Sequence, residues 1–309
     1  MELRQLRYFL AVVDAGSITR AARKLHVVQS ALSHQVANLE AEFNTELLLR
    51  SNNGVQPTET GLAMYRHALA VIKNVDAIGQ SLHALDNEVR GAVTIGLPNS
   101  TADVLALPLL NAVRRELAHV ELGIVEGLSG MLSEQLTAGR LDMCILFDAE
   151  PMRGFDCVPL MKERLHFVSA LPEAHKAYGR ARAINLKDAV KWPLVLPPKP
   201  NSVRILLERE AARADLRLQV VADLSGMRTI LAAVEGGLAS SVTMAANAAA
   251  YSRRKKLLML PIRNPAIDRS AGLFQPQQVS LTVAARGVRE ITLRLVKELV
   301  AQGHWPGAR

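Results

Sequence analysis

The sequence has few of the residue patterns on which catalysis and metal binding depend. Its only cysteines are Cys144 and Cys157, and no cluster of cysteine and histidine has the spacing of metal ligands. Phosphate-binding motifs of the G-x-G-x-x-G and P-loop types are absent. The histidines, His166 and His175 among them, lack a serine and carboxylate pattern that would form a catalytic set. The sequence therefore predicts a protein that is not an enzyme and has no metal or organic cofactor.

Long hydrophobic runs are also missing. No apolar run approaches the roughly 18 residues that span a bilayer. The opening MELRQLRYFL is amphipathic and charged, which excludes a secretory signal. We expect a cytoplasmic protein with no membrane contact. Cys144 lies in LDMCILF, a run typical of a buried strand, and two unreactive thiols are favoured over a redox-sensing disulfide, the alternative that stays open.

Basic charge is not concentrated at the start of the chain. The net charge is +8, but residues 1–57 contribute +1, residues 58–90 contribute −1, and residues 91–309 contribute +8. Charge alone therefore does not predict nucleic-acid binding by the first segment. The length of 309 residues and the apolar content of 49% instead indicate two or three domains with real cores.

The stretch from Ser17 to Phe43 has the pattern of a short helix, a turn and a longer helix. Ser17 is a suitable N-cap for the first helix. The second helix has an apolar stripe at Leu32, Val36, Leu39 and Phe43. Its outward face near the start is short and polar: Gln29, Ser30, Ser33 and His34. Such a helix can lie in a DNA major groove, although this pattern alone is also typical of an ordinary bundle helix.

The next residues predict a hairpin and a long helix. Asn53-Gly54 lies between two short extended runs, which indicates a β-hairpin placed as a wing. Thr58 is a suitable N-cap for a helix that runs to about residue 87. Apolar residues recur along it at steps of three and four, which favours pairing with a second copy over packing on its own domain.

Beyond residue 91, strands alternate with helices, which predicts mostly parallel sheets. The expected strands are 93–96, 120–125, 141–147, 164–171, 194–196, 218–222, 239–242 and 279–284, with a return of the chain to its first half near 261–273. The expected helices are 105–117, 131–137, 203–214, 227–235 and 288–301.

The first sixty or so residues resemble the amino-terminal head of LysR-type transcriptional regulators. The match includes AA in the second helix, LH…Q.ALS.Q…LE in the third, and then LL.R, P-T and TG. The resemblance implies an α/β fold with a winged helix-turn-helix at 1–58, a linker and dimerisation helix at 59–90, and a two-subdomain, periplasmic-binding-protein-like effector domain at 91–309. Subdomain I would span about 91–162 and 268–309, and subdomain II about 163–267. VTIGLPNSTADVLALPLL and NTELLLRSNNGVQPTETG are similar to the nitrogen assimilation control group.

The resemblance implies a regulator that binds a pseudo-symmetric site on double-stranded DNA as a homodimer or homotetramer, works with RNA polymerase, and responds to a small, anionic effector. Bases would be read by Gln29, Ser30, Ser33 and His34. Phosphates would be contacted by Ser17, Thr19, Gln35 and Arg50, with Asn53 on the wing. Ser30 replaces the family's usual proline, and His34 replaces a frequent arginine, so we expect a different or looser sequence preference.

An effector would bind at the carboxyl ends of the strands, held by helix N-termini and hydroxyls. The candidates are Asn99, Ser100, Thr101, Ser129, Asn201, Ser202 and Gly237. Each of these residues could instead serve only as a helix cap. Two alternative functions are disfavoured. The DNA-binding head and the missing signal sequence argue against a solute-binding protein. The missing catalytic set argues against an α/β enzyme fused to a DNA-binding head.

Overall fold

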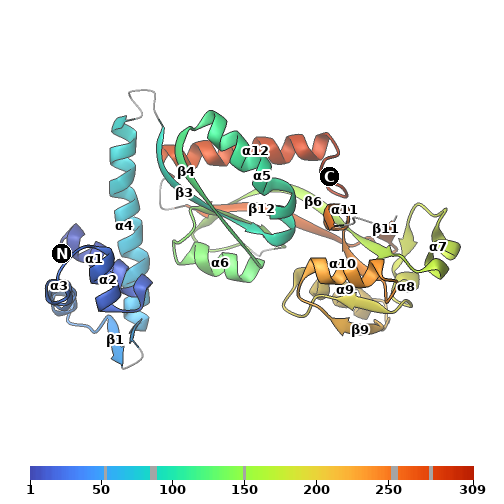
Figure 1. Ribbon diagram of the computed structural model, residues 1–309, viewed down its shortest axis with the longest axis horizontal. Helices are drawn as coiled ribbons and strands as arrows, with labels where there is room; N and C mark the ends of the chain where they lie inside the picture. Colours follow the sequence, from blue (N-terminus) through green and yellow to red (C-terminus); the bar gives the residue numbers. More distant parts are fainter. Residues whose placement is uncertain (52–53, 84–88, 149–150, 252–256, 278–280) are drawn as a thin grey trace.

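A computed structural model describes residues 1–309 except 52–53, 84–88, 149–150, 252–256 and 278–280. Figure 1 shows a small helical head at the N-terminus, one long helix beside it, and two α/β lobes that follow one another. Within the described residues, no helix is long and apolar enough to cross a membrane.

The head consists of three helices around one core. They are α1 (Leu3–Ala15), α2 (Ile18–Lys24) and α3 (Gln29–Glu42). Ser17 caps α2, as predicted, because its side chain accepts a hydrogen bond from the Arg20 backbone N–H. Leu32, Val36 and Leu39 of α3 are fully buried. The prediction for Phe43 was wrong: it follows the end of α3 and is 47% exposed, because it faces an open apolar cavity rather than the core.

The predicted wing is an antiparallel hairpin of β1 (Leu48–Ser51) and β2 (Gly54–Pro57), in which Ser51 pairs with Gly54. Of the expected turn Asn53-Gly54, Asn53 lies outside the described residues and Gly54 is the first residue of β2. Gly54 has φ +122, and a Cβ there would lie 2.6 Å from the Gly16 carbonyl oxygen. Glycine is therefore required where the wing meets the loop between α1 and α2.

The long helix α4 (Glu59–His83) starts at the predicted N-cap, since the Gly61 N–H donates to the Thr58 hydroxyl at 2.9 Å. The continuation predicted to residue 87 falls on undescribed residues. Lys73 joins α4 to the first lobe through a 2.8 Å ion pair with Asp142.

The first lobe has a sheet with helices on both faces (Figure 1). Its strands are β3 (Arg90–Pro98), β4 (His119–Gly127), β5 (Met143–Phe147), β6 (Phe155–Ser169) and β12 (Asp268–Pro276). Helices α5 (Asn99–Glu116) and α12 (Val283–Ala301) cover one face, and α6 (Ser129–Thr137) covers the other. β3 pairs in parallel with β4 and β5, whereas β12 is antiparallel to β5 and β6.

The second lobe is built on the far half of β6. β10 (Ser241–Met244) and β11 (Leu258–Arg263) pair with it antiparallel, and β7 (Ile184–Asn185) pairs with β11 in parallel. A small parallel sheet joins β8 (Leu194–Leu196) to β9 (Val220–Asp223). The helices are α7 (Pro172–Tyr178), α8 (Leu186–Ala189), α9 (Ser202–Arg213), α10 (Met227–Glu235) and α11 (Ala245–Tyr251).

Several sequence expectations differ from this structure, and three of them concern the lobes' sheets and helices. The sheets are mixed rather than mostly parallel, because β6 and β12 cross between the lobes antiparallel to each other. α5 begins at Asn99, six residues before the predicted 105. The apolar periodicity did not reveal this start because the first turn of the helix is polar. Residues 283 and 284 belong to α12 and not to a strand, because Thr282 caps the helix there.

The two cysteines are free thiols. Cys144 on β5 and Cys157 on β6 both pair with Phe274 of the strand between them. Two strand spacings put their Cα atoms about 10 Å apart, beyond the roughly 7 Å limit of a disulfide. Burial raises the pKa of the Cys144 thiol to about 12, which keeps it protonated.

Candidate DNA-binding surface and effector cleft

The turn between α2 and α3 is held by backbone geometry. His26 adopts φ 55, and the Val27 N–H donates to the Ala22 carbonyl at 3.0 Å. This directs the first residues of α3 outward, where Gln29, Ser30 and His34 are exposed. An exposed, uncharged helix start next to a wing is the geometry that major-groove reading requires.

Weak side-chain hydrogen bonds connect this helix start to its neighbours. The Thr19 hydroxyl donates to Gln29 Oε1 at 3.1 Å, which links α2 to α3. Arg50 on β1 donates to the Ser33 hydroxyl at 3.3 Å, which links the wing to α3. His34 Nδ1 lies 3.3 Å from the amide nitrogen of Asn38. Of the predicted DNA-contacting residues, Thr19, Gln29, Ser30, His34 and Arg50 are exposed, and Ser17, Ser33 and Gln35 are half-buried. Asn53 lies outside the described residues.

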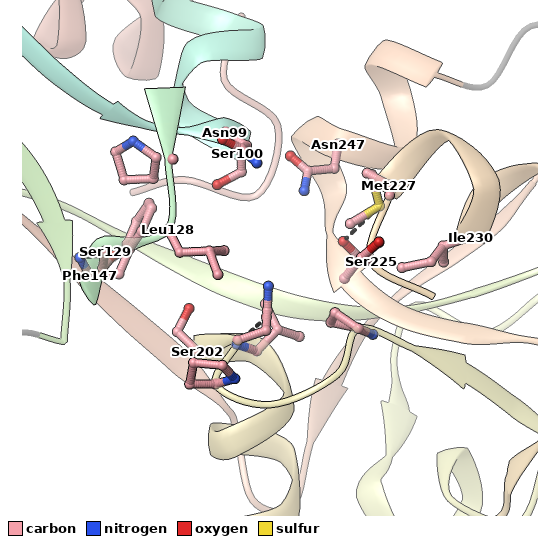
Figure 2. Close-up of a pocket in the computed structure, with 18 of the residues that line it drawn as sticks. Asn99, Ser100, Leu128, Ser129, Phe147, Ser202, Ser225, Met227, Ile230 and Asn247 are labelled. Carbon is pink, nitrogen blue, oxygen red and sulfur yellow. Dashed lines mark hydrogen bonds between the residues drawn. The ribbon is translucent and has the colours of Figure 1, made fainter. Parts of the chain in front are cut away.

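A cleft of about 280 Å³ lies between the two lobes. The first residue of each of four helices lines it: Asn99 of α5, Ser129 of α6, Ser202 of α9 and Met227 of α10. Figure 2 shows these residues converging on the space from both lobes. Helix N-termini present unpaired backbone N–H groups and partial positive charge, so the cleft is suited to an anionic group.

Two of the sequence candidates lie outside this lining. Gly237 is not a cleft residue: it takes φ 73 just after the C-terminal end of α10, whereas the cleft receives the N-terminal end. Thr101 is fully buried in the first turn of α5 and does not line the cleft. Asn201 lines the cleft and also caps α9, since its Oδ1 accepts from the Val203 N–H at 2.9 Å.

The cleft's only lining arginine among the described residues, Arg269 on β12, was missed by the sequence reasoning. It is 4% exposed, and its guanidinium lies 2.6 Å from a carboxylate oxygen of Glu163 on β6. It also donates to the Ser100 hydroxyl at 2.8 Å and stacks 3.5 Å from the centre of the Phe147 ring. Trp305 donates to the second Glu163 oxygen at 2.8 Å, so the carboxylate is satisfied on both sides.

The two arginines in and near the cleft are paired with carboxylates. Arg269 is paired with Glu163, and Arg204, in the first turn of α9, is paired with Glu208 and Asp223. Lys199 and Arg204 lower the pKa of Glu208, which keeps that carboxyl ionised. An anion in the cleft would thus rely on helix N-termini and hydroxyls more than on a free cation.

The comparisons with known proteins cover nearly the whole chain. Residues 3–62 match the bacterial regulatory helix-turn-helix protein, lysR family, and residues 86–297 match the LysR substrate binding domain. The nitrogen assimilation regulatory protein nac of Klebsiella aerogenes is 33% identical over 297 residues, which are 96% of this chain and 95% of that protein. The chain belongs to the LysR family. The nac protein of Escherichia coli is 29% identical over 98% of this chain and 97% of its own length, so the resemblance to the nitrogen assimilation control group is confirmed.

Solved LysR-type structures have the same fold. A full-length OxyR variant from Pseudomonas aeruginosa has a TM-score of 0.79 at 21% identity, over 96% of this chain and 95% of that one. Full-length CbnR complexed with its target DNA has a TM-score of 0.64 at 21% identity, over 96% of this chain and 100% of that one. The chain is thus a LysR-type DNA-binding transcriptional regulator with an effector-binding domain, and not an enzyme.

Sequence patterns contained no signal for several cleft residues of this LysR-type regulator. Phe147, Ser225, Thr243 and Asn247 line the cleft from β5, the loop before α10, β10 and α11. Each lies in a run that short-range periodicity explains as a strand or a helix. Their common position depends on how the two lobes face each other, which only the tertiary structure provides.

Proposed function

We propose that this LysR-type regulator binds a pseudo-symmetric promoter site as a homodimer or homotetramer and responds to a small, anionic effector. In this proposal residues 1–58 form the DNA-binding domain, 59–90 the linker and dimerisation helix, and 91–309 the effector-binding domain, with subdomain I at about 91–162 and 268–309 and subdomain II at about 163–267. It acts in the cytoplasm, where its DNA is, and works there with RNA polymerase.

An apolar surface on the head supports self-association. A cavity of about 410 Å³ is lined almost wholly by apolar atoms of α1, α4 and the segment after α3, including Phe43 and Val71. Of its lining residues, Met1, Phe43 and Val71 are 59, 47 and 38% exposed. Contiguous apolar surface of this kind is typical of an interface, and the proposed occupant is α4 of a second copy.

The proposed DNA contacts lie on the helix-turn-helix and the wing. Gln29, Ser30, Ser33 and His34 would reach base edges. The phosphate contacts proposed are Ser17, Thr19, Gln35 and Arg50, with Asn53 on the wing. The single observation that carries the proposal is the exposed polar start of α3 beside the wing, and a solved LysR-type neighbour, CbnR, is described as complexed with target DNA.

A mobility-shift titration on the DNA upstream of the protein's own gene tests this proposal. Each phosphate contact contributes a slope of about −0.9 to log K against log[salt]. Because the head carries a net charge of only +1, we expect a shallow but non-zero negative slope. A flat line would contradict DNA binding.

For the effector, the proposed contacts are Asn99, Ser100, Ser129, Asn201 and Ser202, which line the cleft at the N-termini of α5, α6 and α9. Small carboxylates and phosphate are the probes, and calorimetric titration of the full-length protein is the measurement. We expect saturable binding by at least one anion, and its absence throughout the panel would contradict the effector half of the proposal.

A further inference from the structure

One polar atom in the cleft is buried without a partner. Asn247, the third residue of α11, is 5% exposed, and its Oδ1 has no hydrogen-bond partner in the described part of the chain. Asn247 lines the cleft, and Figure 2 shows its side chain directed into the space opposite Ser100 and Leu128. A buried acceptor without a donor is costly, and a ligand that supplies the donor removes that cost.

The groups around Asn247 have other contacts. The Thr243 hydroxyl, on strand β10 just before α11, is directed to Met227 Sδ at 3.7 Å. Ser100, across the cleft, accepts from Arg269 at 2.8 Å. Asn247 Oδ1 thus has no donor among the described residues, and an occupant of the cleft can supply one.

The charges of the lining indicate what kind of donor fits. The exposed Glu126 lines the cleft, and Arg269 is neutralised by Glu163. The helix N-termini of α5, α6, α9 and α10 supply partial positive charge at other points of the same wall. A cleft with both kinds of potential suits a ligand that carries a negative group and a positively charged donor together.

We infer that the effector is a small amino acid or a close analogue, with its carboxylate at the helix N-termini and its ammonium N–H donating to Asn247 Oδ1. This inference rests on the proposed function, since it specifies the ligand of the same cleft. Asn247 is then the residue that distinguishes an amino acid from the acid that lacks the amino group. A site built to hydrogen-bond a donor rejects analogues without it because its buried acceptor stays unpaired.

Matched ligand pairs test the inference on the full-length protein. The pairs are L-aspartate with succinate, L-glutamate with glutarate, L-leucine with 4-methylpentanoate, and L-phenylalanine with 3-phenylpropanoate. Isothermal titration calorimetry should show at least one pair in which the amino acid binds tenfold or more tightly than its partner acid. Equal binding within every pair that binds overturns the inference but leaves the anionic effector standing. No binding by any member overturns the inference and the effector half of the proposed function, while the DNA titration still tests the other half.

Variants of Asn247 test whether this residue causes the preference for the amino acid over its partner acid. Asn247→Leu should reduce the affinity ratio of the binding pair to about one, while Asn247→Asp, which keeps a carbonyl-type acceptor, should keep it. Asn111→Leu, an exposed position of α5 outside the cleft, is the matched control and should leave the ratio unchanged. A wild-type ratio in Asn247→Leu overturns the role of Asn247. If that variant does not fold by circular dichroism, loss of the ratio in Asn247→Asp overturns it instead.

Discussion

At the start of α3, polar side chains are exposed and meet through single hydrogen bonds of 3.1 and 3.3 Å, from Thr19 to Gln29 and from Arg50 to Ser33. In the cleft, by contrast, Arg269 and Glu163 are 4 and 2% exposed and share several short contacts. Exposed hydrogen bonds contribute little net free energy and exchange readily for contacts with DNA. A buried, satisfied ion pair keeps its geometry before any ligand arrives. The first region is therefore built to exchange partners and the second to hold its shape.

Breaking the buried pair should have the largest effect. Arg269→Met leaves Glu163 buried without its charged partner, so we expect the free energy of unfolding to fall by about 3–5 kcal/mol in urea titration. Arg294→Met is the control, because it removes one side of the exposed Arg294–Glu116 pair and should leave the midpoint almost unchanged. An equal midpoint for the two variants would contradict a stabilising network in the cleft.

A change at the contact between the wing and the head should have the second largest effect on stability. Gly54→Ala forces a positive φ on alanine and places its Cβ 2.6 Å from the Gly16 carbonyl oxygen, so we expect a loss of about 1–3 kcal/mol. Thermal unfolding measures the loss, and a mobility shift should show weaker DNA binding. Gly130→Ala, where a Cβ meets nothing within 4 Å, is the control. Wild-type unfolding in Gly54→Ala would show that the wing does not depend on this close approach.

The contact between α4 and the first lobe should have a smaller effect. Lys73 and Asp142 are 29 and 16% exposed, and the Asp142 carboxylate also accepts the Thr94 N–H at 2.8 Å. Lys73→Met should cost about 1 kcal/mol or less, because the pair is partly solvated. Hydrogen exchange should become faster along α4 while the cleft lobes keep their protection. Unchanged exchange in α4 would mean that this ion pair does not tie the helix to the lobe.

The smallest effect is a difference in chemical reactivity between the two cysteine thiols. Cys157 is exposed, whereas burial raises the pKa of Cys144 to about 12. A maleimide should therefore modify one thiol per native chain and two per unfolded chain, as read by mass spectrometry. Peroxide treatment of the native protein should produce no disulfide within the chain. Formation of one would contradict the strand register that separates the two cysteines.

Short-range patterns predicted the head better than the cleft. Ser17 and Thr58 were correctly predicted as N-caps because capping depends on residues within one turn. The bounds of α10, Met227–Glu235, agree with the predicted 227–235. Five of the seven effector candidates line the cleft, since strand and helix ends reveal where it opens.

What the sequence did not reveal depends on long-range contacts. Glu163 and Arg269 are 106 residues apart and meet only because β6 and β12 cross between the lobes. Asn247 lies in an alanine-rich helix that has no pattern of its own. Phe43 was assigned to the core because it continues the stripe of α3, but the helix ends one residue before it.

Measuring operator binding by the Gln29→Ala, Ser33→Ala double variant tests most directly whether the start of α3 reads bases. Ser133→Ala with Gln135→Ala on α6 is the matched control, since it removes the same side chains far from the head. Losing a good base contact costs about 1–3 kcal/mol of discrimination, so we predict operator affinity at least tenfold weaker than in the control, with non-specific binding nearly unchanged. Operator affinity equal to that of the control would contradict the account.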